Sequence, residues 1–217
     1  MAYLPLILGL LPSFAWLVFY LKEDPHPEPK TLILEIFAAG AASTLLVLGL
    51  QVLFHGWITS NGIAAYSFFS LLGLAAIEEV FKFLAAFTII SHHKKDFDEP
   101  VDAMIYMIVA ALGFATVENI AAAFNAPDLT FETTSLRFIG ATLLHTLSSG
   151  LIGYFWAKYL IFKKNEFWIQ GALLAVLLHV VFNYLIIRFE PVIIPTTFLI
   201  VFALFILYDF EKLKHIK

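Results

Sequence analysis

The sequence contains no cysteine and has few charged residues. Without cysteine among its 217 residues, the chain can form neither a disulfide nor a thiolate nucleophile. Charged residues make up 14% of the chain, where about 25% is usual in soluble domains. No basic tract interleaved with aromatic residues is present, so nothing in the sequence indicates nucleic-acid binding. Internal repeats and low-complexity segments are also lacking, which favours a single domain over residues 1–217.

Apolar residues are abundant instead: they make up 61% of the chain, and the mean hydropathy is +0.88. A soluble fold of this size could not bury so much apolar surface, whereas a bilayer can cover it. A membrane-spanning helix needs roughly 20 apolar residues. Seven segments reach about that length, and they lie at about 2–21, 31–54, 63–90, 101–124, 138–162, 167–187 and 193–209. The sequence therefore predicts an all-α, polytopic transmembrane helix bundle.

The basic residues predict how this bundle is oriented, because cytoplasmic loops carry an excess of lysine and arginine. With the N-terminus outside and the C-terminus inside, only Arg137 and Arg188 fall on the outer side. The cytoplasmic side then holds Lys22, Lys30, Lys94, Lys95, Lys158, Lys163, Lys164, Lys212, Lys214 and Lys217. We therefore expect a multi-pass membrane protein with its N-terminus outside and its C-terminus inside, surrounded by the lipid bilayer.

Ionisable residues inside the predicted spans are few, and each costs about 2.5–3.5 kcal/mol at the bilayer centre on insertion scales. They are Glu35 near a span edge, Glu78, Glu79 and Lys82 in the third span, Glu118 in the fourth, His145 in the fifth, and His179 in the sixth, where Asn183 follows one turn later. At 1.5 Å of rise per residue, most of these groups fall in the middle-to-outer half of the membrane. That convergence predicts one water-filled cavity formed by spans three to six.

The third span places two carboxylates and one ammonium group on neighbouring helical positions. Lys82 lies four residues after Glu78 and three after Glu79, so it can reach either carboxylate. One ion pair leaves the other carboxylate spare, and a spare carboxylate could serve as a general base. A structural ion pair explains one of the glutamates but not the second. His145 and His179, taken singly, are as consistent with packed, hydrogen-bonded residues as with functional ones.

Two carboxylates and two histidines, without a cysteine, are typical of hydrolysis by activated water. In one route a glutamate accepts the proton of water, while a histidine and Asn183 stabilise the oxyanion. In the other, His145, His179 and Glu79 hold a zinc ion with an open position for water. The H-E-x-x-H signature of many zinc proteases is absent. A zinc-dependent mechanism and a metal-independent glutamate mechanism are therefore both consistent with the sequence. A serine nucleophile is less well supported, because Ser148 and Ser149 lack the G-x-S-x-G context.

Four blocks between about residues 20 and 184 resemble, in order, the PrsW family of intramembrane proteases. They are Glu78-Glu79-Val80-Phe81-Lys82, which matches the motif E-E-x-x-K; Phe97 to Asp102 followed by Gly113 to Asn119; Arg137 with His145 and Gly150; and Leu177-Leu178-His179 with Asn183. The resemblance implies a multi-span endopeptidase of the bacterial cytoplasmic (inner) membrane that cuts a single-span or membrane-associated protein substrate. The founding member makes the first cut, at site 1, in a membrane-bound anti-sigma factor.

The resemblance also implies roles for individual residues, and the related CAAX prenyl endopeptidases share part of the pattern. Glu78 and Glu79 correspond to the essential glutamate pair, and Lys82 corresponds to their ionic partner. His179 corresponds to the site histidine of the last motif, and His145 to the histidine of the fifth span. Glu118 stands at a position that is histidine in the prenyl endopeptidases.

The chain departs from the family pattern at two positions. Asn183 stands where an aspartate is frequent, and Ala103 where a glycine commonly follows the loop aspartate. An amide is a poorer metal ligand than a carboxylate but a competent hydrogen-bond donor, so Asn183 weakens the zinc interpretation. Two other functions compete with proteolysis. They are a non-catalytic membrane scaffold or assembly subunit, and a proton-coupled transporter, for which the expected inverted repeats are absent.

Overall fold

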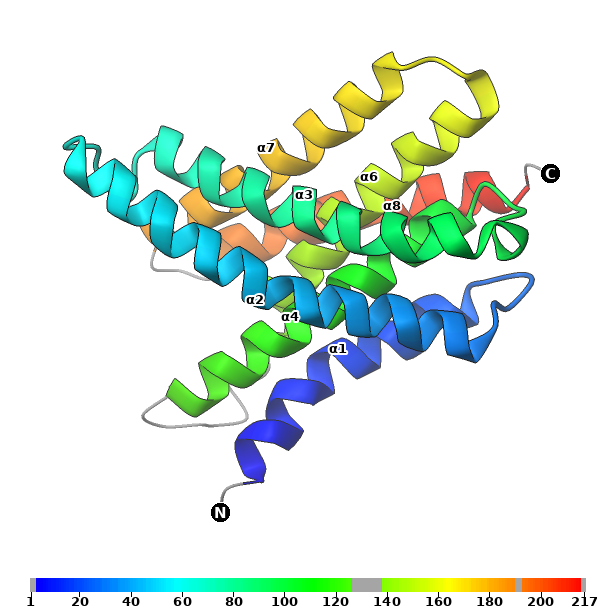
Figure 1. Cartoon of the computed structure of the whole chain (residues 1–217), viewed down its shortest axis with the longest axis horizontal. Coiled ribbons are helices and arrows are strands. Elements are labelled where there is room, and N and C mark those ends of the chain that lie inside the picture. The colour runs from blue at the N-terminus through cyan, green and yellow to red at the C-terminus, as the bar shows by residue number, and fades with distance from the viewer. Residues whose placement is uncertain (1–2, 126–137, 190–192, 216–217) are drawn as a thin grey trace.

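The computed structural model describes residues 3–125, 138–189 and 193–215. This part of the chain forms a bundle of seven α-helices and contains no strand (Figure 1). The helices are α1 (Leu4–Lys22), α2 (Lys30–Ser60), α3 (Phe68–His92), α4 (Asp102–Asn125), α6 (Leu143–Phe162), α7 (Glu166–Arg188) and α8 (Ile193–Lys214). A 3₁₀ turn, η1 (Lys94–Asp96), precedes α4, and a π-helical turn, η2 (Phe138–Thr142), precedes α6. The predicted all-α bundle is confirmed.

Each predicted span overlaps one of these helices, although most helix ends differ from the predicted edges. Within the described residues, five helices are long and apolar enough to cross a membrane, namely α1, α2, α4, α7 and α8. The other two are α3, which carries the buried residues Glu78, Glu79 and Lys82, and α6, which carries the buried residues His145, Ser148 and Ser149. The helix α2 continues to Ser60 and stops before Gly62, whose φ of 69° is the left-handed conformation that favours glycine. The helix α3 starts at Phe68 because the Ser67 side chain caps it by accepting the N–H of Ser70.

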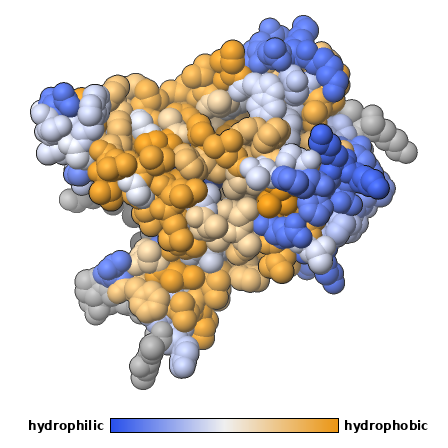
Figure 2. All heavy atoms as spheres, in the orientation of Figure 1, coloured by the Kyte–Doolittle hydropathy of each residue, from blue (hydrophilic) through white to orange (hydrophobic). Residues whose placement is uncertain are grey.

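Successive helices run back and forth across the bundle, so the lysine-bearing connections gather toward one end (Figure 1). These connections are the α1–α2 loop, the η1 loop, the α6–α7 loop and the end of α8. Hydrophilic residues are concentrated at this end, and a hydrophobic band crosses the middle of the molecule (Figure 2). The arrangement agrees with the predicted clustering of lysines, while the N-out orientation stays a prediction. Arg137 and most of the breaks predicted at 125–137 and 188–191 lie outside the described residues.

The centre of the bundle is α4, which packs against α1, α2 and α6. Every residue from 102 to 116 is buried. The helix α2 approaches α4 closely because two glycines stand at the crossing. A Cβ on Gly40 would overlap the carbonyl group of Ala110, and a Cβ on Gly113 would overlap the carbonyl oxygen of Phe37. Small residues commonly allow such backbone contact between membrane helices.

Gly40→Ala is expected to lower the free energy of unfolding by about 1–3 kcal/mol, because the added methyl group must push α2 away from α4. Gly49→Ala in the same helix is the matched control, since a Cβ there meets nothing within 4 Å. That control should be neutral or slightly stabilising, because alanine favours a helix over glycine. Thermal unfolding of the detergent-solubilised protein, followed by circular dichroism, measures both. Equal losses in the two variants would show that the close crossing is not what stabilises the bundle.

Candidate active site

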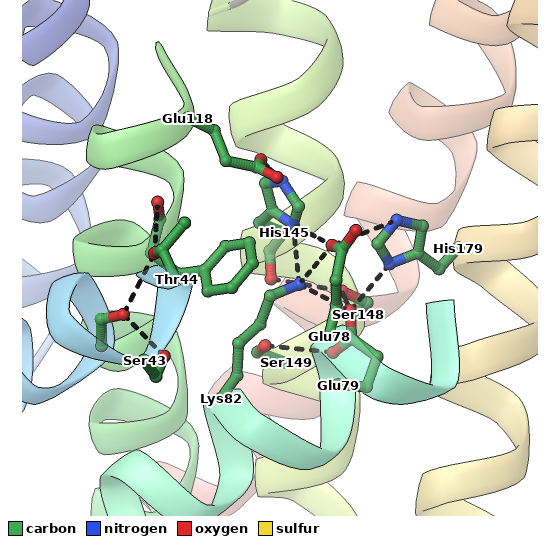
Figure 3. Close-up of polar contacts among 12 residues, drawn as sticks. Ser43, Thr44, Glu78, Glu79, Lys82, Glu118, His145, Ser148, Ser149 and His179 are labelled. Carbon is green, nitrogen blue, oxygen red and sulfur yellow. Dashed lines mark hydrogen bonds and ion pairs between the residues drawn. The ribbon is translucent and has the colours of Figure 1, made fainter. Parts of the chain in front are cut away.

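Four helices bring the predicted polar residues into one buried cluster (Figure 3). The cluster consists of Glu78, Glu79 and Lys82 from α3, Glu118 from α4, His145, Ser148 and Ser149 from α6, and His179 from α7. All of these side chains are buried except that of Glu118, which is 26% exposed. Residues that are up to about 100 positions apart in the sequence therefore meet in the middle of the bundle.

The helical period of α3 explains why its three charged residues point inward. The buried positions of this helix recur at intervals of three and four residues, and Glu78, Glu79 and Lys82 fall on the same stripe as Ala75 and Ala86. Lys82 Nζ lies 2.8 Å from Glu79 Oε1 and 3.5 Å from Glu78 Oε2. The ammonium group also lies 4.7 Å from the centre of the Phe114 ring, which adds a cation–π contact. The closer ion pair is therefore with Glu79.

Glu79 has both carboxylate oxygens engaged. Its Oε1 accepts hydrogen bonds from Lys82 Nζ at 2.8 Å, from the Ser148 hydroxyl at 2.9 Å and from His179 Nδ1 at 2.8 Å. Its Oε2 accepts from the Ser149 hydroxyl at 3.3 Å. A carboxylate held by this many donors is stabilised in its charged form and fixed in position. Glu79 therefore acts as an anchor for His179 and Lys82.

Glu78 is held more loosely than Glu79. Its Oε1 accepts one hydrogen bond, from Gln51 Nε2 at 3.0 Å. Its Oε2 lies 3.5 Å from Lys82 Nζ, 3.6 Å from His179 Nε2 and 3.9 Å from His145 Nδ1. These separations are longer than ordinary charge-assisted hydrogen bonds. The Oε2 atom of Glu78 therefore faces three polar groups without forming a short hydrogen bond to any of them.

The hydrogen-bond partners determine which nitrogen of each histidine carries the proton. His145 Nε2 lies 2.7 Å from Glu118 Oε2, and His179 Nδ1 lies 2.8 Å from Glu79 Oε1. An ionised carboxylate can only accept, so these two nitrogens are the donors. The Lys82 ammonium group can only donate, so His145 Nδ1, 2.7 Å away, is an acceptor. The other ring nitrogen of His179, Nε2, lies 3.6 Å from Glu78 Oε2.

His145 Nδ1, His179 Nε2 and the Glu78 carboxylate form a donor set of the kind that binds zinc. One ligand atom from each of Glu78, His145 and His179 lies within 4.8 Å of the other two. Two histidines and a glutamate bind zinc in hydrolases, and carboxylates commonly hold the second nitrogen of each ligand histidine. Glu118 and Glu79 already hold those nitrogens. The carboxylate whose oxygen meets the ligand atoms of both histidines is that of Glu78. Glu79, which the sequence analysis placed in the zinc set, accepts four hydrogen bonds, one of them from His179 Nδ1.

Two of the residues that the sequence analysis singled out make no hydrogen bond to the cluster in the described part of the chain. Asn183 is half-buried one turn after His179, and in the described part of the chain it makes no hydrogen bond to the cluster. Glu35 lies outside the cluster, with its Oε2 3.0 Å from His93 Nε2. Conversely, Gln51 was missed, although an amide inside an otherwise apolar segment is a signal that could have identified it.

A second group of acidic residues lies at the lysine-bearing end, where Glu28, Asp98 and Asp102 approach one another. Asp102 Oδ2 accepts the backbone N–H groups of Asp98 and Glu99 at 3.1 and 2.8 Å, which fixes the loop before α4. Acidic clusters of this kind are common in proteins without a bound ion. Burial, with a smaller contribution from the neighbouring Asp24 and Asp98 charges, raises the pKa of Glu28 to about 7.

Stability should therefore fall as the pH rises from about 4.5 to 7. In this window the folded protein keeps the Glu28 proton while the unfolded chain has released it, so each increase in pH favours unfolding. Glu28→Gln has no proton to lose, and its melting temperature should change less across the window. Thermal unfolding at pH 5, 6, 7 and 8 measures the difference. Parallel curves for the two proteins would contradict the raised pKa.

An apolar helix bundle that buries two glutamates and two histidines around a shared point has the features of a membrane-embedded hydrolase. The comparison with protein families agrees with this class, since the family described as PrsW family intramembrane metalloprotease matches residues 28–208. The chain belongs to this family and is an integral membrane protease.

Several curated relatives are similar along most of their length. A protein named Protease PrsW from Geobacillus kaustophilus is 29% identical over 185 residues, which cover 84% of this chain and 79% of the relative. The protein of the same name from Oceanobacillus iheyensis is 28% identical over 208 residues, covering 94% and 93%. That from Clostridioides difficile is 26% identical over 186 residues, covering 83% and 78%. No solved structure matches the chain.

Proposed function

We propose that this protease hydrolyses a peptide bond of a single-span or membrane-associated protein with water activated at Glu78. The supporting observation is the position of Glu78 Oε2, which faces His145 Nδ1 and His179 Nε2 without a short hydrogen bond of its own. The other carboxylates of the cluster are occupied, because Glu79 binds four donors and Glu118 binds His145. Glu78 is therefore the carboxylate best placed to take a proton.

In the proposed reaction, Glu78 removes a proton from water as the oxygen attacks the carbonyl carbon of the substrate. The C–N bond then breaks, and the same proton passes from Glu78 to the leaving amine. Lys82 places a positive charge 3.5 Å from Glu78 Oε2, where it can stabilise the negative charge that develops on the carbonyl oxygen. The Asn183 amide, one turn from His179, is the second donor that we propose for this oxygen.

Glu78, His145 and His179 would also hold a divalent metal such as zinc, and the family description as a metalloprotease agrees with that donor set. Bound there, the metal would polarise the carbonyl group and make a bound water more acidic. The Lys82 ammonium group already contacts His145 Nδ1, so it would have to turn toward Glu79 to leave this nitrogen to the metal. Glu118 and Glu79 orient the histidines with or without the metal.

For the substrate, we propose a single-span protein such as a membrane-bound anti-sigma factor, cut at site 1 on its extracytoplasmic side. The family resemblance supports this class, and the membrane location of the site suits a substrate that is itself held in the bilayer. In the predicted N-out orientation, α3 begins on the outer side and the polar cluster lies about three turns into the helix. A substrate segment could therefore reach the cluster from the outer surface.

Reconstitution tests the proposed function. The full-length protein is incorporated into liposomes with a single-span anti-sigma factor tagged at both ends, and the products are identified by mass spectrometry. We expect one cut, in the outer part of the substrate, that His179→Ala abolishes in a folded protein. A substrate that stays intact, or one that both proteins cut equally, would contradict the proposal and favour a non-catalytic scaffold.

Glu118→Gln is expected to reduce cleavage by about 10–100-fold, because the partner that orients His145 becomes neutral and can present its amide nitrogen instead of an oxygen. Since Glu118 is partly exposed, the fold should survive the change. The initial cleavage rate of the reconstituted variant measures the effect, and Glu166→Gln, on the exposed start of α7, is the matched control. Full activity in Glu118→Gln would show that the His145–Glu118 hydrogen bond does not serve the reaction.

A further inference from the structure

A second cavity, separate from the glutamate–histidine cluster, lies between the ends of three helices. Its volume is about 330 Å³. Tyr154 and Lys158 of α6 form one wall, Lys164 and Phe167 around the start of α7 form another, and Lys212 near the end of α8 closes the third side. The cavity therefore lies at the lysine-bearing end of the bundle, beside the α6–α7 connection and the end of α8.

The lining of this cavity is basic, with three lysines and no carboxylate. Nearby carboxylates neutralise the positive charge of these lysines only in part. Asp209 is hydrogen-bonded to the Tyr154 hydroxyl, and Glu166 lies 3.8 Å from Lys164 on the exposed surface. Among the described residues, neither Lys158 nor Lys212 has a carboxylate oxygen within 4.0 Å. Two positive charges therefore face the cavity without a carboxylate in direct contact, although the Asp209 charge acts on both from a longer distance.

Aromatic rings surround one of these charges. Lys158 Nζ lies 4.6 Å from the centre of the Phe167 ring, 5.3 Å from that of Phe155 and 5.5 Å from that of Tyr154. These contacts hold the ammonium group at the edge of an apolar wall, where it is less hydrated than a free lysine. Phe162 also lines the cavity and is 56% exposed, so an apolar rim continues outward from the lysines.

We infer that this cavity binds the phosphate headgroup of an anionic phospholipid, with its acyl chains lying along the apolar rim. Basic pockets between membrane helices on the cytoplasmic side are suited to anionic headgroups, because the lysines meet the phosphate at the level where the hydrocarbon ends. The combination of unpaired lysines and an exposed phenylalanine favours a lipid over a soluble acidic partner, which would leave the apolar rim uncovered. This inference does not depend on the proposed proteolytic mechanism.

Native mass spectrometry of the full-length protein in detergent tests the inference, with phosphatidylglycerol and phosphatidylcholine of identical acyl chains as probes. The wild type should bind phosphatidylglycerol more tightly than phosphatidylcholine. Lys158→Gln/Lys212→Gln should weaken phosphatidylglycerol binding roughly 30-fold, as expected for the loss of two lysine–headgroup contacts. The control is Lys94→Gln/Lys95→Gln, which removes the same charge from the exposed η1 turn and should change binding less than about twofold.

Equal losses in the two double variants, or equal binding of the two lipids, would overturn the inference, because general charge or acyl chains would then explain binding. Displacement of the lipid by glycerol phosphate or by a glutamate-rich peptide at equal concentration would also overturn it, in favour of a soluble ligand. The single variant Lys164→Gln tests the site with little risk of misfolding, because the Lys164 side chain is exposed and Glu166 is its only carboxylate contact among the described residues. That variant should bind roughly fivefold more weakly, and unchanged binding would count against the site.

Discussion

Glu78→Gln is expected to reduce the cleavage rate by about 10²–10⁴-fold while the protein stays folded, because glutamine cannot take a proton from water. The substitution keeps the size of the side chain and can keep the hydrogen bond with Gln51. The remaining contacts of Glu78 are 3.5 Å or longer, so little binding energy is lost with the charge. The single-turnover rate on a reconstituted substrate measures the effect, and circular dichroism with thermal unfolding establishes that the bundle is intact.

Glu35→Gln provides the control for removal of a glutamate from the bundle. Glu35 is half-exposed on α2 and contacts His93 rather than the cluster. Its replacement should leave the cleavage rate within about twofold of the wild type, since it contacts none of the groups that act on water. A Glu78→Gln protein that is folded and still cuts at the wild-type rate would show that another group activates water.

Lys82→Met is expected to destabilise the protein by about 3–5 kcal/mol, the largest stability effect that the structure indicates. Lys82 is completely buried and supplies the nearest positive charge to Glu79, so its removal leaves an uncompensated carboxylate inside the bundle. The Ser148, Ser149 and His179 hydrogen bonds stay, but they cannot replace the ion pair. Unfolding of the detergent-solubilised protein by heat, compared with the wild type, measures the loss.

The double variant Glu79→Gln/Lys82→Met separates the ion pair from other effects of the substitutions. Removing both charges also removes the uncompensated carboxylate, so we expect the double variant to be more stable than Lys82→Met alone. Its cleavage activity should stay low, because the anchor of His179 and the positive charge beside Glu78 are both lost. Additive losses of stability in the double variant would contradict a direct buried ion pair.

The all-helical fold and the approximate position of each helix could be predicted from the sequence, because a helix that crosses a membrane requires a long run of apolar residues. The charged loops around Lys22 to Lys30 and Ser91 to Pro100 interrupt those runs clearly. The helix ends were less predictable. The helix α8 continues to Lys214 because the segment Glu211 to Lys214 consists of good helix formers, although it is not apolar. Hydropathy measures the apolar length of a helix, and not the point where its backbone hydrogen bonds end.

Most residues of the polar cluster could be predicted from the sequence, but the contacts that each of them makes could not. Spacing along one helix places Lys82 near both glutamates. The preference of Lys82 for Glu79 arises from Ser148 and His179, which approach from two other helices. Pairing between His145 and Glu118 likewise depends on how α6 packs on α4, and no rule of spacing within one helix gives that contact.

Gln51 and Asn183 show the limits of helical spacing in opposite ways. Gln51 is an amide in an apolar stretch of α2, which marks it as unusual, but spacing within α2 cannot indicate that its partner is Glu78 on α3. Asn183 shares a helix face with His179, and spacing predicted that the two would act together. Spacing determines the face of the helix but not the direction of the side chain, and the asparagine makes no hydrogen bond with the cluster in the described structure.

The structure of the Glu78→Gln variant with an uncleaved membrane-bound substrate tests the central claim most directly. The claim is that the buried glutamate–histidine cluster is where the peptide bond is cut. We expect the scissile carbonyl carbon within about 5 Å of the residue 78 side chain, so that one water fits between them and His145 and His179 border the same space. A scissile bond more than about 10 Å from this side chain would contradict the claim.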